Sequence, residues 1–180
     1  MATRAPLSLK ARAVGLLAQR EHSRAELRRK LLRIEQQQRR AKHAAVRAAA
    51  GADEEGEPPD TPFDFEDDTE AGETAVDVLL DALAAEGYLN ENRFVESRLH
   101  LRSGRFGTQR IQQELAQHGL KLDAEQQATL RETEMERARE VWQKRFGAEP
   151  PREAAEQARQ MRFLISRGFA PDLVRRLLRA

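Results

Sequence analysis

The stretch AAEGYLNENRFVESRLHLRSGRFGTQRIQQELAQHGL, residues 84–120, contains glycines that divide it into short segments. Within each segment apolar residues recur three or four positions apart, which is the spacing of one face of an α-helix. Gly87 and Gly119 follow such segments and can adopt the left-handed conformation that ends a helix. Gly104 and Gly107 bracket a turn. The stretch therefore predicts short helices joined by sharp turns.

Three predicted helix ends share one pattern: LAAEGYL at 83–89, LAQHGLKL at 115–122 and LISRGFAPDL at 164–173. In each, an apolar residue is followed by three intervening residues, a glycine and another apolar residue, which packs back onto the core. Any helical protein contains such ends, but three among about nine predicted helices favour a tandem helical array. Adjacent units of such an array share a shallow core in an elongated body.

Helices are also predicted on both sides of this stretch. The first covers Leu9–Gln19, and the second begins at the capping box formed by Ser23 and Glu26. Its helix-forming composition continues through a basic segment at 35–50, and helical periodicity resumes at Thr74. We expect no strand.

Capping and stop signals place the remaining helices. Asn90, Thr108 and Asp123 are expected N-caps, since their side chains can accept hydrogen bonds from free amides. Pro171 suits the first turn of the last helix. The other predicted ends are Gly147 with Pro150–Pro151, and Gly168; the expected core residues of the central stretch are Tyr88, Phe94 and Ile111.

The composition suits small helical units. Of 180 residues, 39% are hydrophobic, 5% aromatic and 34% charged, which indicates shallow cores and solvated helix faces. The chain has no cysteine, so disulfides and thiolate metal sites are excluded. No segment approaches the roughly 20 apolar residues of a membrane span, and the start is too charged for a secretory signal. We therefore expect a cytoplasmic protein with no membrane partner.

Charge is distributed unevenly along the chain. Residues 1–47 have a net charge of +10, residues 48–90 of −14, and residues 91–180 of +5. The insert at 51–72 combines acids with glycine and proline. Since such a composition buries little apolar surface, we expect this insert to be disordered.

No catalytic or metal-binding pattern is recognisable. GRFG at 104–107 is too short for a phosphate loop and lacks its lysine. The four histidines have no metal-ligand spacing, and DFEDD at 64–68 lacks the alternating ligands and glycine of a calcium loop. Serines and threonines fit helix caps better than nucleophiles. The sequence predicts a protein that is not an enzyme and has no cofactor.

Arginine is the residue type left to explain. Three basic groups are candidate contacts for a protein or DNA partner: Arg24, Arg28, Arg29 and Lys30; Arg98, Arg102, Arg105 and Arg110; and Arg175, Arg176 and Arg179. Arg98, Arg102 and Arg105 are spaced so that one helix face and the next turn could present them together. Solvated helix surfaces are the alternative. Contacts to DNA would be mainly to phosphate and would weaken steeply with salt.

Three separated blocks resemble the bacterial RecX family, which regulates the RecA recombinase. They are SRAELRRKL at 23–31, LAAEGYLNENRF at 83–94, and GRFGTQRIQQELAQHGL at 104–120. Their order is that of the family, and the similarity weakens after Asp123. One departure stands out. The family usually follows the first block with a few residues, a glycine and a short third helix, whereas this chain continues into the basic segment and the acidic insert.

The resemblance implies an all-α fold of three tandem three-helix repeats in a curved, elongated molecule. The expected repeats are 1–90, interrupted by segments 35–50 and 51–72, then 91–133 and 134–180. We also expect a monomer. The resemblance implies that the protein binds the groove of a RecA–single-stranded DNA filament. It would limit strand exchange, RecA-dependent ATP hydrolysis and co-protease activity in DNA repair and the SOS response.

Two other functions stay open at this stage. The first block could be part of a helix-turn-helix motif of a nucleic-acid-binding protein that acts without RecA; an enzyme with an unrecognisable site is the weaker alternative. The acidic insert raises a separate hypothesis. Because it follows a strongly basic segment, it could compete with DNA or RecA for basic faces, or serve only as a linker.

Overall fold

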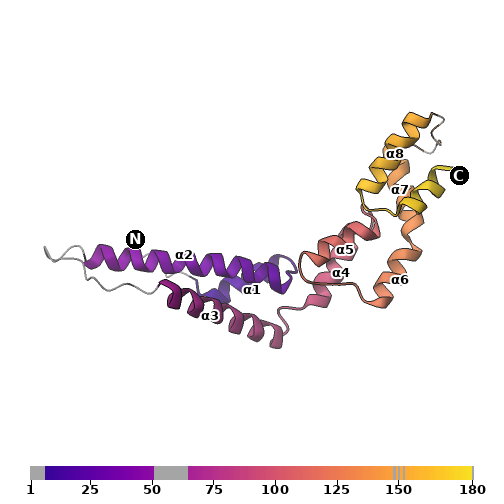
Figure 1. Ribbon diagram of the computed structural model, residues 1–180. Coiled ribbons are helices and arrows are strands. Elements are labelled where there is room, and N and C mark those ends of the chain that lie inside the picture. The colour runs from indigo at the N-terminus through magenta and orange to yellow at the C-terminus, as the bar shows by residue number, and fades with distance from the viewer. Residues whose placement is uncertain (1–6, 51–64, 148, 150, 152, 180) are drawn as a thin grey trace. The chain divides into compact units, whose positions relative to one another are not determined.

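The structure, a computed structural model, describes residues 7–50, 65–147, 149, 151 and 153–179. All regular secondary structure in these ranges is helical (Figure 1), which confirms the all-α prediction. The helices are α1 (Leu9–Gln19), α2 (Arg24–Ala50), α3 (Phe65–Ala85), α4 (Glu91–Arg102), α5 (Thr108–Ala116), α6 (Ala124–Glu132), α7 (Glu134–Phe146), α8 (Ala154–Ser166) and α9 (Pro171–Arg179). Contacts divide the chain into two units, Met1–Asn90 and Glu91–Ala180.

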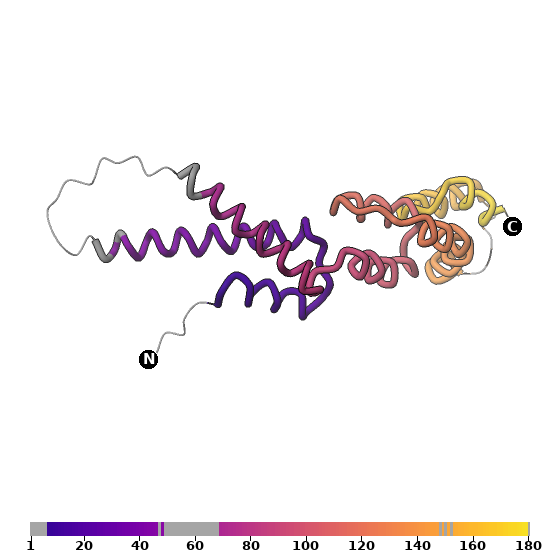
Figure 2. Tube along the Cα trace, turned by 90° about the horizontal axis from the view of Figure 1, so that it is seen from below, coloured from indigo at the N-terminus to yellow at the C-terminus, as the bar shows by residue number. Residues whose placement is uncertain are grey.

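In the first unit, α2 packs against both α1 and α3 (Figure 2). Leu27 and Leu31 lie one helical turn apart on α2 and are fully buried. Val76, Leu80 and Leu83 of α3 cover them. The Ser23 hydroxyl accepts a hydrogen bond from the amide of Glu26 at 3.1 Å, so α2 begins where the sequence predicts.

Helix α3 begins earlier than the sequence suggested. It starts at Phe65 and not at Thr74, so the last part of the expected disordered insert is helical; residues 51–64 lie outside the described residues. Acidic residues near a helix start interact favourably with its dipole. Gly72 is buried, and a Cβ added there would lie 1.9 Å from Nη2 of Arg39. The helical part of the segment whose composition predicts disorder therefore includes a close contact with α2.

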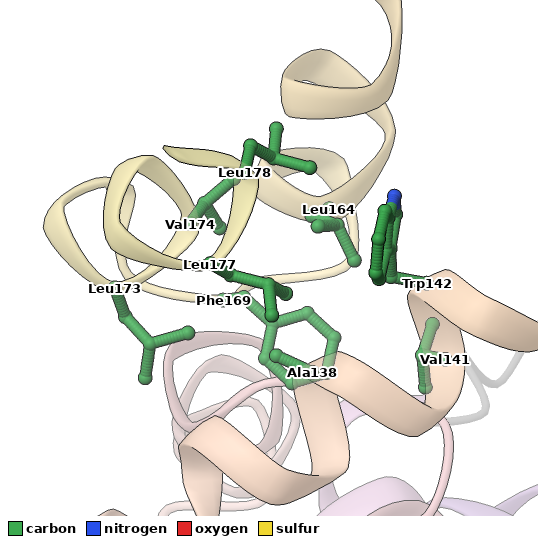
Figure 3. Packing of buried hydrophobic residues seen from close by; sticks show 9 residues of the cluster. All are labelled: Ala138, Val141, Trp142, Leu164, Phe169, Leu173, Val174, Leu177 and Leu178. Atoms are coloured by element: carbon green, nitrogen blue, oxygen red, sulfur yellow. The ribbon is translucent and has the colours of Figure 1, made fainter. Parts of the chain in front are cut away.

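The second unit contains two core clusters. Phe94, Val95, Ile111, Leu115 and Leu130 form the first, from α4, α5 and α6. The second joins α7, α8 and α9, with the ring of Phe169 among their side chains (Figure 3). Helices α6 and α7 are separated by Thr133 alone. The division into repeats at 90/91 and 133/134 stays a prediction.

Two local expectations for the central stretch are wrong. Tyr88 is 48% exposed, whereas the neighbouring Leu89 is 5% exposed and packs into the first unit's core. Thr108 is the first residue of α5, and Gly107 is its N-cap. The amide of Thr108 donates instead to Oε1 of Glu134, at 3.0 Å. A side chain from a different helix therefore supplies the cap that local sequence assigned to threonine.

Candidate nucleic-acid interface

Two of the predicted contact residues are held by carboxylates of α3. Nη2 of Arg24 lies 2.7 Å from Oδ1 of Asp81. Nε of Arg28 lies 2.7 Å from Oδ1 of Asp77, and its Nη2 lies 2.9 Å from Oε2 of Glu73. The three acids are spaced four residues apart, so they follow one face of α3. The hydrogen bond from Arg28 lowers the pKa of Asp77. An external anion must compete with these carboxylates for both arginines.

The rest of the first group lies at the start of α2. Nζ of Lys30 is 3.6 Å from Oε1 of Glu26, which also pairs with Arg20. Burial opposes ionisation of Glu26, but the hydrogen bond from Arg20 and the nearby positive charges lower its pKa to about 2. Arg29 is exposed, and its Nε donates to the carbonyl of Ala25 at 3.3 Å. Arg29 is thus the member of this group without a carboxylate partner among the described residues.

Two members of the second group converge on Glu114. Nε of Arg102 lies 3.1 Å from Oε2 of Glu114, and Nε of Arg110 lies 3.5 Å from Oε1. Together with Arg98, these residues line a polar groove of about 300 Å³ between α4 and α5. The guanidinium of Arg98 lies over the ring of Phe94, 5.1 Å from its centroid. One carboxylate therefore holds two arginines at the edge of an open groove.

Arg105 is not a member of this groove, although the sequence grouped it with Arg98 and Arg102. It lies in the turn after α4, where its carbonyl accepts a hydrogen bond from Nη1 of Arg167 at 3.2 Å. The third arginine of the groove is Arg110, from the next helix. Helical spacing across a turn failed here because the chain changes direction at residues 103–107.

The third group lies on the exposed face of α9. Arg175, Arg176 and Arg179 are exposed, while the opposite face of the helix packs into the core. Nη1 of Arg175 lies 3.0 Å from Oδ1 of Asp172. The structure therefore gives this group a surface position on α9.

Sequence reasoning missed two further exposed arginines, Arg33 and Arg40. They continue the face of α2 that begins at Arg29, at intervals of four and seven residues. That helical spacing was the available signal. Sequence reasoning also missed Arg137, which is 8% exposed and donates to the carbonyls of Ser103, Phe106 and Leu130. No local pattern distinguishes Arg137 from a surface arginine.

The described side chains include no group of three histidines or acids able to hold a metal ion. No helix in the described ranges is long and apolar enough to cross a membrane. The described surface offers guanidinium groups to a partner. These groups bind phosphate and carboxylate groups through paired hydrogen bonds.

Comparison with known proteins identifies the family. A model of the third three-helix domain of RecX matches residues 132–178. The regulatory protein RecX of Leptothrix cholodnii is 45% identical over 182 residues, which cover 99% of this chain and 93% of that protein. The chain belongs to the RecX family. RecX of Ralstonia nicotianae is 44% identical, and the match covers 97% of this chain and 89% of that protein. RecX of Pseudomonas putida is 38% identical, and the match covers 96% of this chain and 90% of that protein.

The blocks that resemble RecX occupy helix boundaries. The first spans the start of α2, the second the end of α3 and the start of α4, and the third the start and end of α5. These are places where caps, glycines and tightly packed side chains constrain the residue type. The segment where the sequence suggested a departure from the family pattern lies in the 27-residue helix α2, whose second half extends beyond the buried leucines.

Proposed function

We propose that this chain regulates the RecA recombinase by binding RecA filaments assembled on single-stranded DNA. It would inhibit strand exchange, RecA-dependent ATP hydrolysis and co-protease activity during DNA repair and the SOS response. The proposal rests on near full-length similarity to RecX regulatory proteins. We further propose that the protein acts as a cytoplasmic monomer, without catalysis of its own.

The structural observation that supports binding is the groove around Glu114. A RecA–DNA filament offers phosphates and acidic side chains, and Arg98, Arg102 and Arg110 line the same groove. An incoming phosphate or carboxylate could replace Glu114 as the partner of Arg102 and Arg110, since their ion pairs are partly exposed to solvent. Contacts of this kind orient a partner but do not read base sequence.

The deciding experiment is RecA-dependent ATP hydrolysis on single-stranded DNA. Purified protein in molar excess over RecA should lower the steady-state rate severalfold. An unchanged rate, with the protein folded by circular dichroism, would contradict the proposed function. A duplex footprint at a defined sequence without RecA would instead favour an independent helix-turn-helix protein.

A variant tests the groove. Substitution of Arg98, Arg102 and Arg110 together by Gln should raise the protein concentration needed for half-inhibition of RecA ATP hydrolysis by roughly tenfold or more. The reason is that each hydrogen bond to a charged group contributes about 1.5–3 kcal/mol. Arg131, Arg139 and Arg159 lie outside the groove on the same unit. Their triple Gln variant has the same net charge and serves as the matched control. Equal inhibition by both variants would remove the groove from the proposal.

A further inference from the structure

A row of polar side chains follows the solvent face of α2. It consists of Arg29, Arg33, Gln36, Arg40 and His43, all of them exposed. Successive members are separated by four, three, four and three residues. At about 3.6 residues per turn, this spacing keeps all five within about 40° of one line along the helix. The row is therefore straight and lies opposite the leucines that bury the other face of α2.

The arginines of this row have no acidic partner in the described part of the chain. Arg29 donates only to a backbone carbonyl, and neither Arg33 nor Arg40 forms an ion pair there. Glu35 lies on a different face of α2 and pairs with Arg39 at 2.5 Å. On α3, Asp81 pairs with Arg24 and Asp77 with Arg28. Glu73 also pairs with Arg28, and it lines one hollow together with Arg33 and Arg40. Acidic side chains are therefore near this row, but each of them pairs with another arginine, and the guanidinium groups of Arg29, Arg33 and Arg40 remain available to an external anion.

The chemistry of the row indicates what it binds. Helix α2 contains no aromatic residue except His43, so it offers few platforms on which unpaired bases could stack. Guanidinium groups match the geometry of phosphate. Double-stranded DNA has one charge per about 1.7 Å of axis, so a row of cations that neutralises several phosphates releases several counterions.

The dimensions of α2 are compatible with this ligand. From Arg29 to Arg40 the row extends about 16 Å at 1.5 Å per residue. This length corresponds to about five base pairs at 3.4 Å each. A helix with side chains is about 10–12 Å wide, close to the width of the major groove of about 12 Å. Past the part covered by the core, residues 41–46 are exposed, so this end of α2 is accessible from several sides.

We propose that the solvent face of α2 binds the phosphate backbone of duplex DNA, without sequence preference and without RecA. Arg29, Arg33 and Arg40 make the contacts. This surface lies on the helix where the sequence suggested a departure from the family pattern, and it is separate from the groove around Glu114. The inference does not rest on the proposed function, because its ligand is DNA alone.

The test is fluorescence anisotropy with a labelled 24-base-pair duplex of arbitrary sequence, at several salt concentrations and without RecA. The variant R33Q/R40Q keeps good helix formers and removes two positive charges. It should bind the duplex roughly 10- to 100-fold more weakly at 0.1 M salt, with a salt slope smaller by about 1.8, since each lost phosphate contact removes about 0.9. R33K/R40K retains both charges and should restore most of the affinity.

The matched control is R139Q/R159Q, which changes net charge equally at exposed helix positions where each arginine pairs with a nearby glutamate. It should bind the duplex like the unaltered protein. Equal weakening by both Gln variants would overturn the proposal, because net charge alone would then explain binding. An unchanged affinity of R33Q/R40Q would also overturn it. If that variant lost only its effect on RecA ATP hydrolysis, the row would be a protein interface and the DNA proposal would again be wrong.

A second arm uses the single strand of the same sequence. Preference for the duplex in the unaltered protein, lost in R33Q/R40Q, supports the proposal. A single-strand affinity that exceeds the duplex affinity and falls in R33Q/R40Q would overturn the choice of duplex. Circular dichroism of each variant verifies that α2 is still helical.

Discussion

Gly107 and Gly168 lie backbone to backbone within the second unit. The amide of Gly107 donates to the carbonyl of Arg167 at 2.9 Å, and the carbonyl of Gly168 accepts from the amide of Gln109 at 3.2 Å. A Cβ added at Gly107 would lie 2.2 Å from the carbonyl oxygen of Gly168. The start of α5 and the turn between α8 and α9 therefore pack as closely as two backbones can.

Substitution G107A should destabilise the second unit by about 1–3 kcal/mol, because the new methyl group meets backbone atoms that cannot rotate away. Gly104 provides the matched control. It lies in the same turn, has no heavy atom within 4 Å of an added Cβ, and lacks a positive φ. G104A should leave stability unchanged or raise it slightly by restricting the unfolded chain. Thermal unfolding followed by circular dichroism measures both; equal midpoints for the two variants would contradict the packing argument.

A buried hydrogen bond gives the second prediction. Nε1 of Trp142 donates to Oε1 of Gln160 at 2.7 Å, and both side chains are 4% exposed. Q160M preserves the approximate volume but leaves the indole N–H without this acceptor. The free energy of unfolding should fall by about 1–3 kcal/mol, the cost of an unsatisfied buried donor.

The control for this variant is Q143M, at an exposed position of α7. It should change stability by less than about 0.5 kcal/mol, as most surface substitutions do. Tryptophan fluorescence supplies an independent measurement, since Trp142 is the single tryptophan of the chain. An emission spectrum identical in Q160M and the unaltered protein would argue against the loss of this bond.

The helix ends were predictable because local chemistry determines them. Gly87, Gly119 and Gly168 have φ values of 77°, 75° and 84°, as the repeated pattern of helix ends requires. Asp123 accepts from the amide of Gln126 at 2.7 Å, and the reciprocal bond completes a capping box. At such positions the stabilising hydrogen bond joins a side chain to a backbone amide two or three residues away.

The features that sequence analysis missed depend on distant residues. Helix α3 begins at Phe65 and contacts α2 closely at Gly72, and α5 is capped by Glu134 from 26 residues away. The candidate site likewise has features that the sequence predicts and features that only the fold shows. Helical spacing can place an arginine on a face, but only the fold distinguishes Arg28, paired with acids of α3, from Arg33, which has no such partner in the described chain.

A third prediction concerns the pH dependence of stability in the first unit. His22 is 1% exposed, and burial lowers its pKa below the ordinary value of 6.5. Its Nδ1 lies 3.3 Å from Oε1 of Glu26, which raises the pKa but does not outweigh burial. Because the unfolded chain takes up the proton first, the contribution of His22 to stability is present above pH 6.5 and is lost as the pH falls.

Glu26 should add a second, more acidic decrease. Its folded pKa is about 2, against an ordinary value of 4.5, so its contribution is lost between pH 4.5 and 2. The free energy of unfolding measured from pH 8 to 3 should therefore fall in two steps. H22Q should remove the step near pH 6.5 and leave the lower one. A profile of H22Q parallel to that of the unaltered protein would show that His22 does not titrate on unfolding.

The last prediction concerns the acidic segment at 51–64, which contains six acids and no basic residue. If it competes with nucleic acid for the basic faces of α2, its deletion should strengthen binding of single-stranded and duplex DNA at low salt. The gain should be severalfold at 0.02 M salt and should vanish near 0.5 M, because attraction between separated charges is screened over less than about 10 Å at high salt.

Substitution of the six acids by Asn and Gln provides the control, since it removes the charge and keeps the length. Equal gains from deletion and neutralisation would support competition by charge. A gain from deletion alone would assign the effect to chain length, and no gain from either would leave the segment as a linker.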